Sequence, residues 1–171
     1  MTIVALSLGS NSNAEHYLTM GLNALQAQFV DLRMSSVFES EPVGFAGDNF
    51  LNMVVVIDTS ETLENLARYL KRLEDLHGRI RQGPRFSGRT LDIDILTYGD
   101  LSGVHADIVL PREEVAENAY VLWPLAQVLG EQVHQPSGRT YAQLWNAYDK
   151  SRQRLQPVEF IWQGRQVSAH F

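Results

Sequence analysis

Short apolar runs in this chain alternate with longer stretches in which leucine returns every three or four residues. Short apolar runs predict strands, and the leucine spacing predicts amphipathic helices with one face toward a core. Strands are expected at 3–8, 32–38 and 50–57. Helices are expected at 14–29 and 61–77. The segment 39–49 contains Pro42, Gly44 and Gly47 and therefore predicts a loop.

The segment 88–100 predicts a further strand with acidic residues at alternate positions. Side chains alternate along a strand, so Asp92 and Asp94 share one face. Ile93 and Ile95 take the opposite face and are expected in the core.

The order of these elements is β-α-β-β-α-β, which is the arrangement of ferredoxin-like α+β domains. Such a domain has an antiparallel sheet with both helices packed on it. The pattern weakens after residue 99, which indicates a mixed C-terminal extension. Two short helices and a late strand are expected there, at 115–129, 140–148 and 160–162. We expect one domain over 1–171, with a core at about 1–148 and a tail at about 149–171.

The acid pair has a basic counterpart just before it in the chain. Two neighbouring carboxylates repel each other unless a positive charge lies close, and Mg²⁺ takes oxygen ligands and often arrives with phosphates. The preceding segment supplies arginines, which suit bidentate phosphate binding: Arg79, Arg81, Arg85 and Arg89. The pattern predicts metal-assisted chemistry on a polyphosphate. A simpler interpretation is that both groups are solvated surface charge.

Composition narrows the class of protein. The 171 residues include 44% hydrophobic and 20% charged residues, and the formal net charge is −6. This acidic balance argues against a general nucleic-acid binder, which is usually basic. The absence of cysteine excludes disulfides and thiolate metal sites. With neither a basic signal-peptide start nor a membrane-length apolar run, we expect a cytoplasmic protein without membrane partners.

Several motifs together resemble the 6-hydroxymethyl-7,8-dihydropterin pyrophosphokinase family over about 3–148. The most specific is the run Arg-Thr-Leu-Asp-Ile-Asp-Ile-Leu at 89–96. The others are Leu-Gly-Ser-Asn at 8–11, Ser-Glu-Pro-Val-Gly at 40–44, Phe-Leu-Asn at 50–52, Gly-Arg-Ile-Arg at 78–81 and Leu-Trp-Pro-Leu at 122–125.

The resemblance implies transfer of a diphosphate from ATP to the hydroxymethyl group of the dihydropterin, with release of AMP, in folate biosynthesis. It implies two Mg²⁺ ions held by Asp92 and Asp94. The implied catalytic residues are Arg79, Arg89, Asp92 and Asp94. The implied ATP-binding residues are Glu74, Arg79, Arg81, Arg85, Arg89, Ile95 and Arg112. The implied pterin-binding residues are Ser40, Val43, Phe50, Asn52, Phe86 and Tyr120.

The chain departs from the family pattern at several of these positions. Phe50 replaces the usual tyrosine, and Phe86 stands where tryptophan is common. Arg112 and Glu113 replace a histidine and an aromatic residue, and Asn118 replaces an arginine. Arg112 is expected either to contact nucleotide phosphates or to pair with Glu113 or Glu114 on the surface.

These departures leave a second hypothesis, a divergent paralogue that binds pterin or nucleotide with weak or altered catalysis. A ferredoxin-like interaction module and an RNA-binding sheet are further alternatives, the latter disfavoured by the acidic composition. The expected partners are ATP and the dihydropterin, with no nucleic acid, and the chain is expected to be a monomer.

Overall fold

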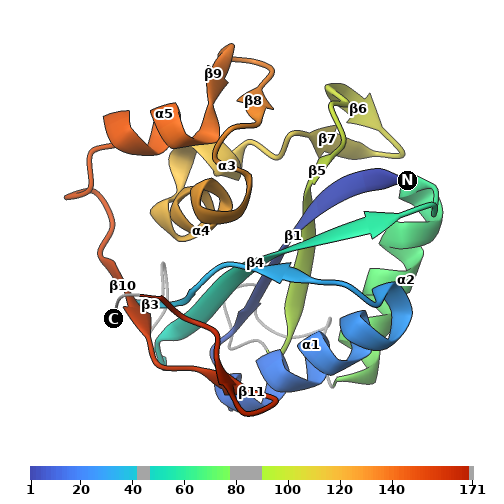
Figure 1. Ribbon diagram of the computed structural model, residues 1–171, viewed down its shortest axis with the longest axis vertical. Coiled ribbons are helices and arrows are strands. Elements are labelled where there is room, and N and C mark those ends of the chain that lie inside the picture. Colours follow the sequence, from blue (N-terminus) through green and yellow to red (C-terminus); the bar gives the residue numbers. More distant parts are fainter. Residues whose placement is uncertain (42–46, 78–89, 170–171) are drawn as a thin grey trace.

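The computed structural model describes residues 1–41, 47–77 and 90–169 and is built on one antiparallel sheet (Figure 1). The strand order is β10-β3-β4-β1-β5, with β2 also paired to β4. The strands are β1 (Thr2–Ser10), β2 (Arg33–Met34), β3 (Val37–Ser40), β4 (Phe50–Thr59), β5 (Asp92–Tyr98) and β10 (Leu155–Val158). Helix α1 (Ala14–Phe29) follows β1, and α2 (Leu63–Leu76) follows β4. The predicted ferredoxin-like order is confirmed.

The predicted strand at 32–38 is in fact two strands separated by a bulge. Met34 lies opposite Val55 and Phe38 lies opposite Asn52, so three residues face two on β4. The hydroxyl of Ser35 accepts a hydrogen bond from the backbone N–H of Val54 at 2.8 Å. A serine side chain therefore replaces a backbone carbonyl in the ladder, and such an insertion bends a strand. The apolar pattern alone does not reveal this exchange.

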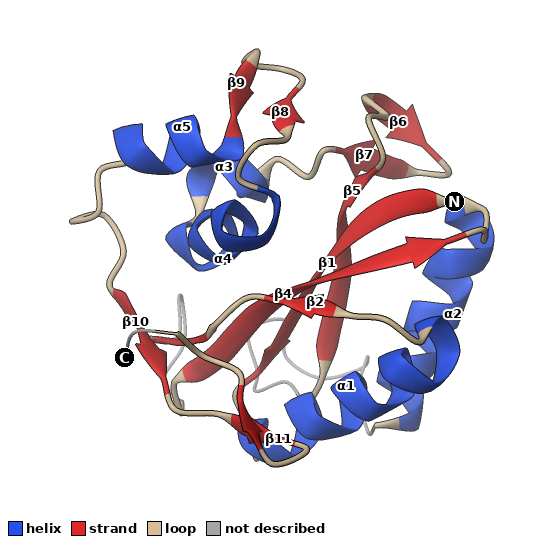
Figure 2. Cartoon of the chain, viewed as in Figure 1, coloured by secondary structure: helices blue, strands red, loops and turns tan. Residues whose placement is uncertain are grey.

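Helices α1 and α2 cover one face of the sheet, as predicted (Figure 2). Their leucines pack against alternate residues of β1, β4 and β5, and each buried leucine contributes about 1.5–3 kcal/mol. This helix-side core includes Leu18, Leu22, Leu25, Leu66, Leu70, Leu6, Met53, Ile93 and Ile95. The side chain of Thr62 begins α2 by accepting the backbone N–H of Asn65 at 3.1 Å.

Within the described residues, elements that follow β5 pack on the opposite face (Figure 1). These are α3 (Glu114–Glu117), α4 (Ala119–Leu129) and α5 (Tyr141–Ala147). Val121, Leu122 and Leu125 of α4 pack on Val54 and Val56 of β4. Two hairpins border this cover, β6 (Gly103–His105) with β7 (Ile108–Leu110) and β8 (Val133–His134) with β9 (Arg139–Thr140). Both short helices expected after residue 99 are present in this region.

The C-terminal segment, residues 149–169, closes over the sheet edge. Strand β10 pairs with β3, and a hairpin of β11 (Ile161–Trp162) and β12 (Arg165–Gln166) follows. The indole of Trp162 donates to Asn23 of α1 at 2.9 Å. Ser168 accepts the backbone N–H of Val37 at 2.8 Å. Among the described residues, no helix combines the length and the apolar character needed to cross a bilayer.

Candidate active site

The two aspartates of β5 lie on the face of the sheet opposite α1 and α2. Asp92 is opposite Gly9 and Asp94 is opposite Ser7 on β1. Ile93 and Ile95 point the other way and are each 5% exposed in the helix-side core. The predicted division of this strand into an acidic and an apolar face is therefore confirmed.

Among the described residues, a pocket of about 180 Å³ opens on this face beside α4. It collects side chains from β1, β3, β4, β5, α3 and α4. Its lining comprises Ser7, Gly9, Ser40, Glu41, Phe50, Asn52, Asp92, Asp94, Glu114, Tyr120 and Val121. Four predicted pterin residues, Ser40, Phe50, Asn52 and Tyr120, thus share one pocket with the acid pair.

Gly9 leaves room for the side chain of Asn52 in this pocket. The two residues are directly opposite each other on β1 and β4. A Cβ atom at position 9 would come within 2.8 Å of the Oδ1 atom of Asn52. The amide of Asn52, which is 7% exposed, donates to the hydroxyl of Ser40 at 3.0 Å. Asn52 is therefore held by a close backbone approach on one side and a hydrogen bond on the other.

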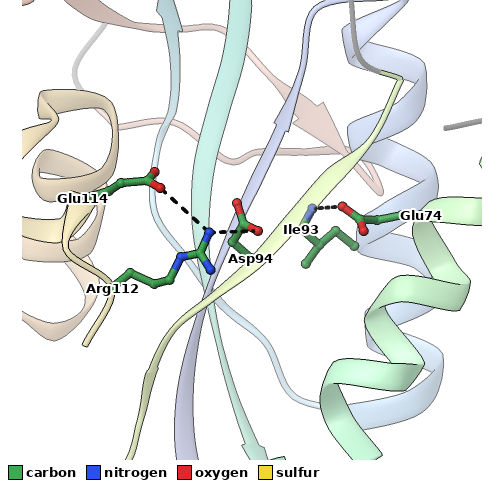
Figure 3. Close-up of polar contacts among 5 residues, drawn as sticks. All are labelled: Glu74, Ile93, Asp94, Arg112 and Glu114. Carbon is green, nitrogen blue, oxygen red and sulfur yellow. Dashed lines mark hydrogen bonds and ion pairs between the residues drawn. The ribbon is translucent and has the colours of Figure 1, made fainter. Parts of the chain in front are cut away.

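Glu74 supports the acid strand from the helix side. Its carboxylate accepts the backbone N–H of Ile93 at 2.9 Å (Figure 3), and Ile93 is the residue between the two aspartates in the sequence. Strand β5 ends the strand order of the sheet, so this N–H faces away from β1. Glu74 is 6% exposed, and its carboxylate therefore satisfies a backbone donor that no described strand pairs. Neither Glu74 nor Ile95, both predicted at the nucleotide site, lines the acid pocket.

Arg112 lies between two of the pocket's carboxylates (Figure 3). One guanidinium nitrogen is 3.5 Å from the Oδ1 atom of Asp94 and 3.8 Å from the Oε1 atom of Glu114. Its backbone N–H donates to Leu96 of β5 at 3.0 Å, which anchors the residue beside the acid strand. The pairing with Glu114 matches the surface alternative, whereas the contact with Asp94 was not anticipated.

Tyr120 forms the α4 side of the pocket and is held by residues outside it. Asn118 donates from its amide to the Tyr120 hydroxyl at 3.0 Å. Gln153, on the C-terminal segment, donates to Asn118 at 2.9 Å and accepts the backbone N–H of Ala119 at 2.7 Å. Burial raises the pKa of Tyr120, and Glu114, Asp94 and Asp92 raise it further, against the lowering effect of the Asn118 hydrogen bond.

Gln153 is a site residue that the sequence reasoning missed. The first N–H groups of a helix need acceptors from outside the helix, and Gln153 supplies one for α4. The available signal was the Asn118 position at the start of that helix, which suggests a capping residue. No local pattern connects it to a glutamine 35 residues later.

The remaining predicted site residues are outside the described part of the chain. They are Val43, Arg79, Arg81, Arg85, Phe86 and Arg89.

Comparisons with known proteins point in one direction. The sequence profile of the family described as 7,8-dihydro-6-hydroxymethylpterin-pyrophosphokinase (HPPK) matches residues 5–130. The 2-amino-4-hydroxy-6-hydroxymethyldihydropteridine pyrophosphokinase of Bacillus subtilis is 33% identical over 130 residues, covering 74% of this chain and 77% of its own. The protein of that name from Methylorubrum extorquens is 34% identical over 132 residues, covering 75% of this chain and 83% of its own.

Some relatives are longer proteins. The folate synthesis bifunctional protein of Arabidopsis thaliana is 32% identical over 130 residues, which cover 74% of this chain but 27% of that protein. The crystal structure of wild-type Plasmodium falciparum HPPK-DHPS has a TM-score of 0.66 and 16% identity, covering 86% of this chain and 41% of that one. At this identity the structural likeness concerns the fold.

Proposed function

The chain belongs to the 7,8-dihydro-6-hydroxymethylpterin-pyrophosphokinase family, and we propose that it transfers a diphosphate from ATP to the hydroxymethyl group of 6-hydroxymethyl-7,8-dihydropterin, releasing AMP. Family membership makes it an enzyme, a pyrophosphokinase of folate synthesis that acts on small molecules. Members of this family in general use ATP and Mg²⁺. The observation that carries the proposal is the shared pocket: the acid pair of β5 opens onto the same space as Ser40, Phe50, Asn52 and Tyr120.

Asp92 and Asp94 fit a magnesium site. Both present hard carboxylate oxygens on one strand face, and the Arg112 guanidinium already lies 3.5 Å from Asp94, so this face accepts positive charge. Within the described ranges no group of three or more acidic or histidine side chains forms a metal cage. Mg²⁺ is typically held by one or two carboxylates together with substrate phosphates and water. Two bound ions would neutralise phosphate charge and ease attack at phosphorus.

The pterin is proposed to lie on the floor of the pocket. A flat heterocycle needs ring faces to stack on and polar groups around its edge. Phe50 and Tyr120 supply rings from β4 and α4, and Phe86 and Val43 are proposed to complete this side. The linked amide and hydroxyl of Asn52 and Ser40 supply edge contacts. Their positions are fixed by the sheet, so the hydroxymethyl group can be held toward the aspartates.

The proposed nucleotide contacts come from residues before and after β5 in the sequence. Arg79 and Arg89 would bind the triphosphate and stabilise the charge that develops on AMP, and Arg81 and Arg85 would also bind ATP. Arg112 would bind a phosphate in place of Asp94 and Glu114, and its side chain is 32% exposed and therefore accessible. Glu74 and Ile95 are proposed to act near the nucleotide by supporting the strand.

Release of AMP tests the proposal directly. The protein is incubated with ATP, MgCl₂ and 6-hydroxymethyl-7,8-dihydropterin, and adenine nucleotides are separated by chromatography. We expect AMP only when all three are present, and its loss in Asp92→Asn but not in the matched variant Asp100→Asn, at the exposed turn after β5. Release of ADP, or AMP formation that does not need the dihydropterin, would exclude the reaction.

The divergent-paralogue alternative has its own outcome in this assay. Arg112 contacts Asp94, and Asn118 contacts Tyr120. These internal contacts favour the alternative, because they engage two residues that replace a histidine and an arginine of the family pattern. Binding of both substrates by calorimetry without AMP release would establish it. A monomer is proposed for the active form, and sedimentation velocity at assay concentration checks that state.

A further inference from the structure

The hydrogen-bond chain from Gln153 to Tyr120 has a fixed direction. A backbone N–H can only donate, so the side-chain atom of Gln153 that faces Ala119 at 2.7 Å must be the carbonyl oxygen. The amide nitrogen of Gln153 therefore faces Asn118, at 2.9 Å. The atom of Asn118 that receives this bond must be its oxygen.

The same reasoning continues to the pocket. With its oxygen occupied by Gln153, Asn118 presents its amide nitrogen to the Tyr120 hydroxyl at 3.0 Å. That nitrogen donates, so the phenolic oxygen accepts and its own proton must point elsewhere. Within residues 1–41, 47–77 and 90–169 the Tyr120 hydroxyl donates no hydrogen bond, and Tyr120 lines the pocket beside Asp94 and Glu114.

We propose that the Tyr120 hydroxyl is a specificity-determining hydrogen-bond donor to an acceptor atom of the bound heterocycle, and that Gln153 is the positioning residue that sets this polarity. The ligand's identity rests on the proposed function, whereas the polarity rests on the contacts alone. The C-terminal segment thereby becomes part of the site, although it contributes no atom to the acid pocket.

The surroundings of Tyr120 keep this donor available at neutral pH. Burial and the carboxylates of Glu114, Asp94 and Asp92 all raise the pKa of the phenol, so it retains its proton. A ring carbonyl or an unprotonated ring nitrogen would accept it, whereas a protonated ring nitrogen would not. Tyr120 thus distinguishes heterocycles by the pattern of donors on their edge, beyond the stacking that any aromatic residue provides.

Reversing the direction of the hydrogen bonds between Gln153, Asn118 and Tyr120 tests the proposal. In Gln153→Glu, one carboxylate oxygen still accepts the N–H of Ala119, and the other needs a donor, so Asn118 must turn over. Its oxygen then faces Tyr120 and takes the hydroxyl proton. We expect dihydropterin affinity, measured by fluorescence titration, to fall about three- to tenfold, with no change in affinity for a non-hydrolysable ATP analogue. Asn118→Asp reverses only the last step and should have the same effect.

A matched control exists on the same segment. Gln163, in the exposed β11–β12 hairpin, donates from its amide to Gln26 at 2.7 Å. Gln163→Glu makes the same chemical change in a similar amide contact away from the pocket, and should leave both affinities unchanged.

A double-mutant cycle separates polarity from general damage. Tyr120→Phe keeps the ring and should lose about three- to tenfold in dihydropterin affinity. In the Tyr120→Phe background, Gln153→Glu should lower the dihydropterin affinity no further, because no hydroxyl remains whose proton could be redirected. An undiminished affinity in Tyr120→Phe would overturn the proposal, and so would an equal loss from Gln153→Glu with and without the hydroxyl.

A measurement without ligand distinguishes this proposal from the proposed function. The ¹³C resonance of the Tyr120 phenolic carbon at neutral pH reports whether the hydroxyl donates or accepts. We expect Gln153→Glu and Asn118→Asp to move it in the same direction, and Gln163→Glu to leave it in place. An unmoved resonance in both variants would overturn the assigned polarity. If the resonance moves but the parent binds no dihydropterin, the proposed function fails while the polarity stands.

Discussion

The two faces of the central sheet are built from the same strands but do different work. On the helix side, alternate residues of β1, β4 and β5 are sealed under α1 and α2 with almost no exposed surface. On the opposite side, among the described residues, α4 packs on part of the face, and beside it lies a pocket lined by acidic, polar and aromatic residues. One period-two pattern thus specifies a core and a site together, because adjacent residues of each strand serve opposite faces.

This comparison predicts which substitutions cost stability and which cost activity. A change on the helix side creates a cavity in close-packed surroundings, whereas the pocket already contacts solvent.

The largest contrast is expected along β5. Asp92→Ala or Asp94→Ala should abolish AMP release while the fold survives, since loss of a metal ligand removes on the order of several kcal/mol of transition-state stabilisation. Ile93→Ala or Ile95→Ala should instead lower the free energy of unfolding by about 2–5 kcal/mol and leave turnover per folded molecule largely intact. AMP release and urea denaturation measure the two effects. Near-normal turnover in both aspartate variants would show that the site is assigned wrongly.

The helix side could be predicted almost entirely from the sequence, and this prediction is confirmed. Its signal is local: leucine spacing identifies α1 and α2, and alternation identifies the buried side of β5. The bulge at Ser35 was missed because a hydroxyl substitutes for a carbonyl there, which no apolar pattern records.

The pocket side was predicted as a set of residues but not as a set of contacts. Asp92, Asp94, Ser40 and Asn52 were identified from motifs, and the register of β1, β4 and β5 brings them together. The arrangement of Arg112 with Asp94 depends on where the segment after β7 returns to the sheet. The contact of Gln153 with Asn118 spans 35 residues and has no periodic signal. The roles of these residues stay predictions.

The next effect concerns the charge that borders the pocket. Arg112→Ala should weaken ATP binding about tenfold, because a charge-assisted contact to phosphate is lost. Unfolding free energy should change by less than about 1 kcal/mol, since the side chain is partly exposed. Calorimetric titration with a non-hydrolysable ATP analogue and Mg²⁺ measures the first quantity, and Arg139→Ala, on the exposed β9, is the matched control.

Arg112→His sharpens the same test. A histidine should restore part of the affinity below a pH of about 6.5 and lose it above, whereas the arginine contact should persist. Unchanged ATP affinity in Arg112→Ala would make the residue a surface charge paired with Glu114.

Alanine substitution of one glycine on each side of the sheet adds a single methyl group and tests the two sides separately. Gly9→Ala places a Cβ 2.8 Å from Asn52 Oδ1, so Asn52 must leave its bond to Ser40, and dihydropterin affinity should fall about three- to tenfold. Gly21→Ala on α1 meets the methyl groups of Leu91 at 3.4 Å, an ordinary contact, and should change stability by no more than about 1 kcal/mol without affecting binding. Equal pterin affinities in the two variants would contradict the proposed role of Asn52.

The smallest effect concerns the β8–β9 hairpin, which contains a buried imidazole. His134 of β8 is 7% exposed, lies 2.8 Å from the hydroxyl of Ser137 through Nδ1 and packs edge-on against Tyr141.

Burial lowers the pKa of His134 below the usual 6.5. Below that pH the unfolded chain takes up a proton that the folded chain resists, so stability falls as pH drops from about 6.5 through the folded pKa. The slope from one such group is at most about 1.4 kcal/mol per pH unit. Urea denaturation between about pH 7.5 and about pH 5 should therefore show a shallower acid slope in His134→Gln than in the parent. His105→Gln, at an exposed position of β6, should keep the parental slope. If both variants keep the parental slope, the loss of stability in acid arises elsewhere and the His134 imidazole is not its cause.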